Sequence, residues 1–256
     1  MKTLVVAQQK GGVGKTSSLV HLAFDFLERG LRVAVIDLDT QGNASFTLQE
    51  FGNGYLASQM FDQDGDALRH AFRELPEGSL MRLIESDAVL ANMEKRSLTD
   101  AAAAFKENIQ ALADSGFDVV LIDTAPALGV SLAAALYAAD CVLSPIELEA
   151  YSIQGIKKML TTIANVRKLN TKLKFLGMVP SKVDARNPRH VRHQVELRTA
   201  YPQLMIPAGI GLRSSIADAL ASGVPVWKIK KTAARKATQE VRALAAYVFE
   251  KMEIKQ

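Results

Sequence analysis

The chain has 256 residues, of which 48% are apolar and 23% are charged, and its formal net charge is +4. This length suits one large α/β domain or two small ones, and the composition is ordinary for a globular protein with a buried core. The single cysteine, Cys141, excludes a disulfide framework and a cysteine-rich metal site. No apolar stretch reaches the roughly 18 residues of a membrane span, and no signal peptide precedes the first expected strand. We therefore expect a cytoplasmic protein, with Cys141 in its core.

A glycine-rich segment, residues 8–17, follows the first expected strand at residues 4–7. Behind it, apolar residues recur with helical spacing as far as Gly30. Between a strand and a helix, glycines let backbone N–H groups surround a phosphate, and the helix N-terminus adds partial positive charge. Lys15 would then reach the β- and γ-phosphates, and the Thr16 hydroxyl would bind Mg²⁺. The sequence therefore predicts a P-loop.

The loop departs from the standard pattern G-x-x-x-x-G-K-[ST], because Gln9 stands where the first glycine is required. The segment K-G-G-V-G-K-T instead has a second lysine, Lys10, before its glycines. This arrangement resembles the deviant P-loop of the ParA/MinD family of ATPases. The resemblance implies that Lys10 reaches across a dimer interface to the partner's nucleotide. The nucleotide-binding residues that it implies are Lys10, Gly11, Gly12, Val13, Gly14, Lys15, Thr16, Ser17 and Pro207.

Two aspartates, Asp37 and Asp39, follow the apolar run at residues 33–36. Open α/β sheets bind ligands at this end of their strands. The segment is similar to the family's second nucleotide motif, D-x-D-P-Q-x-N, with Thr40 in place of the proline. The resemblance implies that Asp39 orients the attacking water and helps to hold Mg²⁺ through its hydration shell. We expect Asp37 to anchor the end of the strand.

Residues 46–100 carry no comparable motif. Asp62, Asp64 and Asp66 have the spacing of a calcium loop, but Arg73 occupies the twelfth position, where an EF-hand needs glutamate. We therefore expect an exposed loop and a helix start at the aspartates, and a short strand at residues 81–84.

Asp123 ends a continuous apolar run at residues 117–122, which follows a helix expected over residues 101–113. Such a run is typical of the Walker B strand of a parallel sheet that is covered on both faces. Asp123 would accept a hydrogen bond from Thr16 and from the Mg²⁺ shell. The resemblance implies that the next residues, T-A-P, form a switch that senses the γ-phosphate. The candidate catalytic residues are thus Lys10, Lys15, Asp39 and Asp123, and the candidate metal site is Thr16, Asp39 and Asp123.

Expected strands and helices alternate as far as the C-terminus. The strands lie at residues 141–145, 173–179 and 204–206, and the helices at residues 152–169, 188–201 and about 233–252. Strands separated by helices imply an α/β fold, with a mostly parallel, doubly wound sheet and helices on both faces. No linker interrupts the pattern, so we expect a single P-loop ATPase domain over residues 1–256.

Positive charge is concentrated in the C-terminal part. Residues 1–181 contain 17 Lys and Arg against 21 Asp and Glu, whereas residues 182–256 contain 14 against 6. This asymmetry predicts a polyanionic partner. The basic residues lack the spacing of a base-reading helix or of an aromatic single-strand binder, so they fit contact with a phosphate backbone without sequence preference. The resemblance implies a C-terminal basic surface that binds DNA, which Arg235 and Lys236 match best. The candidate DNA-binding residues, for each of which solvated surface charge is the alternative, are Lys182, Arg186, Arg213, Lys228, Lys230, Lys231, Arg235 and Lys236. The role of Trp227 stays open between packing and an interface.

The resemblance covers nearly the whole chain and implies a small ParA-type ATPase, without an N-terminal helix-turn-helix, that partitions plasmid or chromosomal DNA. It implies ATP and Mg²⁺ as cofactors, and an ATP-bound homodimer that binds non-specific double-stranded DNA of the nucleoid. It also implies hydrolysis stimulated by a ParB-like centromere-binding protein. A MinD-like ATPase that cycles on membranes is one alternative, although residues 249–256 are poor in large apolar side chains. An ATPase that positions a protein cargo is the other. An iron–sulfur reductase of the nitrogenase type is excluded, because it needs more cysteine than Cys141.

Overall fold

One parallel sheet forms the centre of the molecule. The computed structural model describes all residues except 63, 74, 76, 79, 150–151 and 255–256. In this part of the chain, seven strands follow the order β3-β4-β2-β5-β1-β6-β7, and every pair of neighbours is parallel. The strands are β1 (Lys2–Val6), β2 (Arg32–Leu38), β3 (Gly52–Leu56), β4 (Leu80–Glu85), β5 (Val119–Thr124), β6 (Cys141–Ile146) and β7 (Lys174–Pro180). Because the chain winds from β1 first toward β3 and later toward β7, the carboxyl end of β1 is a topological switch point, where such sheets bind ligands.

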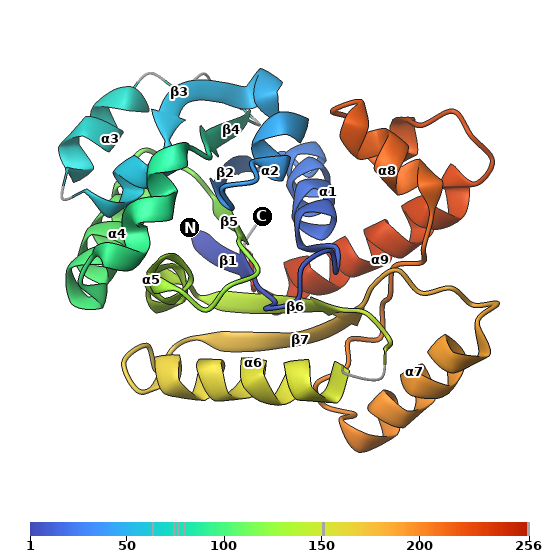
Figure 1. Ribbon diagram of the computed structural model, residues 1–256. Helices are drawn as coiled ribbons and strands as arrows, with labels where there is room; N and C mark the ends of the chain where they lie inside the picture. Colours follow the sequence, from blue (N-terminus) through green and yellow to red (C-terminus); the bar gives the residue numbers. More distant parts are fainter. Residues whose placement is uncertain (63, 74, 76, 79, 150–151, 255–256) are drawn as a thin grey trace.

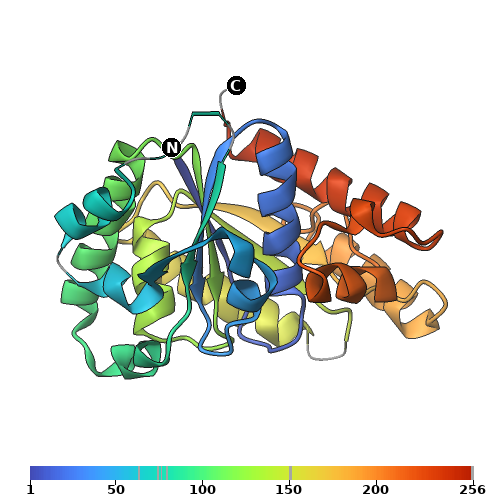
Figure 2. The same cartoon turned by 90° about the horizontal axis from the view of Figure 1, so that it is seen from above.

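Helices cover both faces of the sheet (Figures 1 and 2). They are α1 (Lys15–Glu28), α2 (Asn43–Thr47), α3 (Gly65–Ala71), α4 (Leu98–Asp114), α5 (Val130–Ala138), α6 (Ser152–Arg167), α7 (Pro188–Ala200), α8 (Ser214–Ala221) and α9 (Ala234–Lys251). Short 3₁₀ segments are η1 (Gln49–Phe51), η2 (Ala57–Phe61), η3 (Ala88–Lys95) and η4 (Val226–Lys228). Figure 2 shows α4 on one side of the sheet and α1 with α9 on the other. The predicted doubly wound fold is confirmed.

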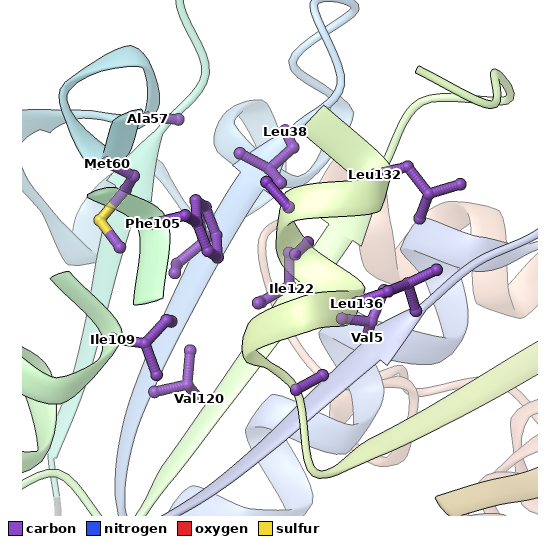
Figure 3. Packing of buried hydrophobic residues seen from close by; sticks show 14 of the residues in the cluster. Val5, Leu38, Ala57, Met60, Phe105, Ile109, Val120, Ile122, Leu132 and Leu136 are labelled. Atoms are coloured by element: carbon purple, nitrogen blue, oxygen red, sulfur yellow. The ribbon is translucent and has the colours of Figure 1, made fainter. Parts of the chain in front are cut away.

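Each central strand sends alternate side chains into two cores. In β1, Val5 packs in the layer of α4 and α5 (Figure 3), whereas Leu4 and Val6 pack in the layer of α1 and α9. This is the two-residue period of a strand. Both sets are apolar because helices exclude water from both faces. Cys141 is 1% exposed in the α1 and α9 layer, which confirms the prediction that it is a core residue.

The segment between β2 and α4 contains more structure than its sequence indicated. The edge strand β3 was not predicted, because among its five residues only Tyr55 is buried and no apolar pattern marks it. Asp64 caps α3 by accepting a hydrogen bond from the Ala67 N–H at 2.9 Å, so the aspartates are a loop and helix start, as predicted. The strand expected at residues 204–206 was wrong: the pairing there is a single bridge between Met178 and Met205.

No helix in the described part of the chain combines the length and the apolar character that a bilayer crossing requires. The last helix, α9, ends at Lys251. Residues 255–256, which belong to the C-terminal segment weighed above for membrane binding, lie outside the described residues.

Candidate nucleotide-binding site

The glycine-rich loop joins β1 to α1 in a turn that requires glycine. Gly12 and Gly14 have φ angles of +74° and +91°, in the left-handed region that glycine adopts without steric cost. A side chain at Gly14 is excluded for a second reason, because its β-carbon would lie 2.6 Å from Oγ of Ser181. Gly14 is the N-cap of α1, so the loop presents the first N–H groups of a 14-residue helix.

A pocket of about 480 Å³ opens at this loop. Its volume lies in the range of small-molecule sites, roughly 300–1,000 Å³. The lining residues come from the P-loop, the end of β2, α2, the segment after β5, the segment after β7, and α8. They are Gly11, Gly12, Gly14, Lys15, Thr16, Ser17, Asp39, Gln41, Asn43, Phe46, Thr47, Pro126, Lys182, Leu220 and Ala221. Sequence patterns identified the P-loop and Asp39 but gave no signal for the contributions of α2 and α8.

Lys15 is buried at the floor of this pocket, with 6% of its surface exposed. Burial lowers the pKa of its ammonium group, while the nearby carboxylates of Asp123 and Asp39 act in the opposite direction. A cation removed from water at the start of a helix is arranged to receive an anion. The contact of Lys15 with the β- and γ-phosphates stays a prediction.

Thr16 and Asp123 meet as predicted, although 107 residues separate them in the sequence. The Thr16 hydroxyl donates to Oδ2 of Asp123 at 2.6 Å. Asp123 is fully buried, and burial raises its pKa to about 7, with repulsion from Asp37 adding to the increase and the Thr16 hydrogen bond opposing it. The contact arises because β5 lies next to β1 in the sheet, which places Asp123 opposite Val6.

The two aspartates after β2 have different surroundings. Asp37 is buried and accepts hydrogen bonds from the N–H and the hydroxyl of Ser45, both at 2.8 Å, and from the Asp39 N–H at 3.1 Å. Burial nevertheless raises its pKa. It anchors the strand end, as predicted. Asp39 lines the pocket instead, and its Oδ1 accepts the Gln41 N–H at 3.0 Å.

The donor set fits a magnesium ion that is bound mainly by phosphates. Among the described residues there is no group of three or more His, Cys, Asp or Glu side chains that could hold a metal by itself. Mg²⁺ usually keeps several waters and takes one or two protein ligands together with substrate phosphates. Thr16 and Asp39 line the pocket, and Asp123 orients the Thr16 hydroxyl by accepting its hydrogen bond.

Lys10 does not line this pocket but contacts two glutamates after β6. Its Nζ lies 2.6 Å from Oε2 of Glu147 and 2.5 Å from Oε2 of Glu149. The hydrogen bond to Glu147, followed by that to Glu149, raises the pKa of Lys10. Half of the Lys10 side chain is exposed to solvent, so the group remains accessible from outside the protomer.

The candidate DNA-binding residues do not form one surface. Lys182 lines the 480 Å³ pocket at the P-loop, which we call the nucleotide pocket. Arg213 is 22% exposed and donates from Nη2 to Oε1 of Glu240 at 2.5 Å, so its charge is paired within the protomer. Arg186 is 93% exposed and lies beside Asp184.

Four of the remaining candidates, Lys228, Lys230, Lys231 and Arg235, line one open depression of about 460 Å³ at the start of α9. Lys236 is exposed on the first turn of the same helix. Pro207 is exposed and lies outside the lining of the nucleotide pocket, so its contact with nucleotide stays a prediction.

Trp227 is a packing residue that joins this basic segment to the P-loop helix. Its Nε1 donates to Oε1 of Glu28 on α1 at 2.6 Å, and the Arg242 guanidinium lies 3.6 Å from the centre of its ring. Behind it, Nε2 of His21 accepts the Val226 N–H at 3.2 Å. No sequence pattern indicated this network, because its members lie on three separate elements.

Comparisons with known proteins identify relatives over most of the chain. A family model described as an AAA domain matches residues 1–175. Protein IncC of Escherichia coli is 70% identical over an alignment 270 positions long, which covers 100% of this chain and 71% of that protein. The chromosome-partitioning ATPase Soj of Thermus thermophilus is 31% identical over 224 residues, which cover 87% of this chain and 86% of that one.

Solved structures share the fold over nearly the full length. An ATP complex of a McdA variant from Cyanothece superposes with a TM-score of 0.81 at 25% identity, covering 100% of this chain and 98% of that one. A plasmid partition protein of Borrelia burgdorferi bound to AMPPNP superposes with a TM-score of 0.74 at 21% identity, covering 98% and 99% of the two chains.

Proposed function

Since the chain belongs to the ParA-type family of partition ATPases, we propose that it couples ATP hydrolysis to DNA binding in a cycle of two protomers. Membership follows from the family model over residues 1–175 and from the IncC relative at 70% identity. In the proposed cycle, ATP and Mg²⁺ close two copies of the chain, each a single domain over residues 1–256, into a homodimer that binds double-stranded DNA of the nucleoid without sequence preference. A ParB-like centromere-binding protein stimulates hydrolysis, and the DNA is released.

The observation that supports this cycle best is the buried Lys15 beside the Thr16–Asp123 hydrogen bond, at the start of α1. The P-loop backbone and Lys15 would bind the phosphates, and the Thr16 hydroxyl would be a ligand of Mg²⁺. Bound Mg²⁺ supplies positive charge to the phosphates. Asp39, whose carboxylate lines the pocket, would accept a hydrogen bond from the attacking water and orient it.

The second proposed element of the cycle is that Lys10 acts on the nucleotide of the other protomer. Its side chain is half exposed, and it lies outside the pocket that its own P-loop forms. The ion pair with Glu149 joins two half-exposed side chains, and such a pair is worth only about 0–1 kcal/mol, so Lys10 gives it up at little cost when a phosphate is offered instead. A lysine that joins the two sites makes dimerisation depend on ATP.

The third element is DNA contact by the basic depression at the start of α9. Lys228, Lys230, Lys231 and Arg235 all line it, and none belongs to the nucleotide pocket. Contacts to the phosphate backbone carry no sequence information. Two copies of this surface in one dimer double the number of contacts in a rigid unit, and this multiplies affinity. DNA binding would therefore follow the nucleotide state.

Two experiments test the proposal. Calorimetry should show that Lys15→Ala or Thr16→Ala loses Mg²⁺·ATP binding, and unchanged binding would remove the assignment of the site. Anisotropy with random-sequence duplex DNA should show binding with ATP and little with ADP. Arg235→Glu with Lys236→Glu should abolish DNA binding but keep ATP-dependent dimerisation. Lys106→Glu with Lys168→Glu, at two exposed lysines outside the depression, is the control because it changes the net charge by the same amount.

Salt dependence separates backbone contact from other modes of binding. The slope of log affinity against log salt is negative, and its magnitude should fall by about one unit for each phosphate contact removed. Equal DNA affinity with ADP and ATP, or a slope near zero, would contradict the proposed cycle.

A further inference from the structure

Lys182 lies beside the P-loop, although its charge had placed it among the DNA-binding candidates. It follows β7 by two residues and lines the nucleotide pocket. A β-carbon placed on Gly12 would lie 3.9 Å from its Nζ. The neighbouring Ser181 approaches Gly14 to 2.6 Å by the same measure. The end of β7 is therefore pressed against the P-loop, and Lys182 points its ammonium group at that loop.

The backbone of Lys182 is held in an unusual conformation. Its φ angle is +54°, and among the described residues other than glycine only Glu253 shares a positive φ. The flanking residues fix this geometry, because the Ser181 N–H donates to the Ile146 carbonyl at 2.7 Å and the Val183 N–H donates to the Ile210 carbonyl at 3.0 Å. The left-handed region is disfavoured for a residue with a long side chain, and such conformations cluster at ligand sites.

Lys182 shares a carboxylate with Lys10. Its Nζ lies 3.6 Å from Oε1 of Glu147, whereas Lys10 lies 2.6 Å from Oε2 of the same residue. The longer distance is an ion pair without hydrogen-bond geometry. A phosphate oxygen bound in the pocket would offer Lys182 a charge-assisted hydrogen bond, and such bonds are roughly twice as strong as neutral ones.

We propose that Lys182 binds the phosphate chain of the nucleotide in its own protomer and is not a DNA contact. This inference rests on the proposed nucleotide site. Lys15 supplies positive charge from the start of α1, and Lys182 supplies it from the segment after β7. The two lysines that contact Glu147 then bind different nucleotides: Lys182 binds the nucleotide of its own protomer, and Lys10 binds that of the other protomer.

The test compares ATP affinity in Lys182→Asn, Lys182→Arg and the native chain by calorimetry. Asparagine tolerates the left-handed conformation, so the substitution removes the charge and leaves the backbone in place. Loss of a charge-assisted hydrogen bond at a site that is 45% exposed should weaken ATP binding about 10-fold. Lys182→Arg should restore most of the affinity. Lys172→Asn is the matched control, because Lys172 is an exposed loop residue two positions before the first residue of β7, at the other end of the strand.

Two further readouts separate a phosphate contact from a structural role. The loss in Lys182→Asn should shrink at high salt, because screening weakens the interaction that the variant lacks. DNA affinity at saturating ATP should equal that of the native chain. A loss of ATP affinity that is independent of salt, or native ATP affinity with weakened DNA binding, would overturn the proposal.

The proposed function and this inference fail in different ways. If Lys15→Ala loses ATP while Lys182→Asn binds it like the native chain, the nucleotide site stands and the role of Lys182 is refuted. If both variants bind ATP like the native chain, the site itself is wrong. Thermal unfolding without nucleotide shows whether Lys182→Asn is folded, and Lys182→Gly replaces it if it is not, since glycine relieves the φ angle and also removes the charge.

Discussion

Alanine at Gly14 should strain the P-loop in two separable ways. The φ angle of +91° costs a residue with a β-carbon about 1–2 kcal/mol. The β-carbon would also lie 2.6 Å from Oγ of Ser181, and overpacking of this kind costs about 1–3 kcal/mol. Gly14→Ala should therefore lower the free energy of unfolding by about 2–5 kcal/mol if the two costs add.

The same helix provides a control for the first cost. Gly30, just after the C-terminal end of α1, has a φ angle of +89°, and nothing lies within 4 Å of a β-carbon placed there. Gly30→Ala should therefore lose only the conformational part, about 1–2 kcal/mol. Ser181→Ala removes the nearest atom that a β-carbon at Gly14 would meet and leaves Oγ of Ser17 at 3.2 Å. Adding it to Gly14→Ala should therefore recover most of the overpacking cost of about 1–3 kcal/mol.

Urea unfolding of the nucleotide-free protein gives the free energy of unfolding of the native chain, Gly14→Ala, Gly30→Ala and the double variant. The ATP affinity of each, measured by calorimetry, shows whether the loop keeps its shape. The reasoning is refuted if Gly14→Ala is no less stable than Gly30→Ala. It is also refuted if Ser181→Ala does not restore stability in the double variant, because the close approach of the segment after β7 to the P-loop would then not exist.

Three further predictions concern the site and the buried histidine of the helix that follows it. Lys10→Ala should bind ATP like the native chain but fail to form the ATP-dependent dimer, which size-exclusion chromatography with ATP measures. Normal dimerisation would contradict a contact between Lys10 and the nucleotide of the other protomer. Asp39→Ala should accumulate an ATP-bound dimer, with hydrolysis lost and DNA binding kept. Hydrolysis at the native rate would show that another residue orients the attacking water. His21 is buried, and burial lowers its pKa although the backbone hydrogen bond to Ser17 opposes the shift. Below about pH 6.5, His21 therefore binds a proton in the unfolded chain but not in the folded chain. Its contribution to the free energy of unfolding is present above that pH and is lost as the pH drops toward 5. His21→Gln should show a shallower fall in unfolding free energy over this window, and an unchanged slope would exclude His21 as its source.

The nucleotide motifs could be recognised from the sequence because each is contained in one short segment. Glycines before Lys15, and aspartates at the ends of apolar runs, specify backbone geometry and chemistry within about ten residues. The run before Asp123 identified a strand that is covered on both faces, and the structure places that strand next to β1. The predicted Thr16–Asp123 hydrogen bond followed from these two local patterns together with the rule that parallel strands end at one edge.

The basic residues could not be sorted in the same way. Charge along a chain predicts that a region meets an anion, but it does not say which anion or which face. The structure separates residues that the sequence had grouped: Lys182 lies in the nucleotide pocket, Arg213 pairs with Glu240, and Lys228 lines the depression at the start of α9.

The sequence by itself determined the fold class, the P-loop and the two carboxylates of the site, because these depend on contiguous residues and on the periodicity of buried strands. The tertiary structure alone decided which strand ends become neighbours, which cations are already paired and which side chains close the pocket. Those contacts join segments distant in sequence, such as Ser181 and Gly14, and their short separations depend on how β7 packs beside β6. A pattern within one segment contains no information about that packing.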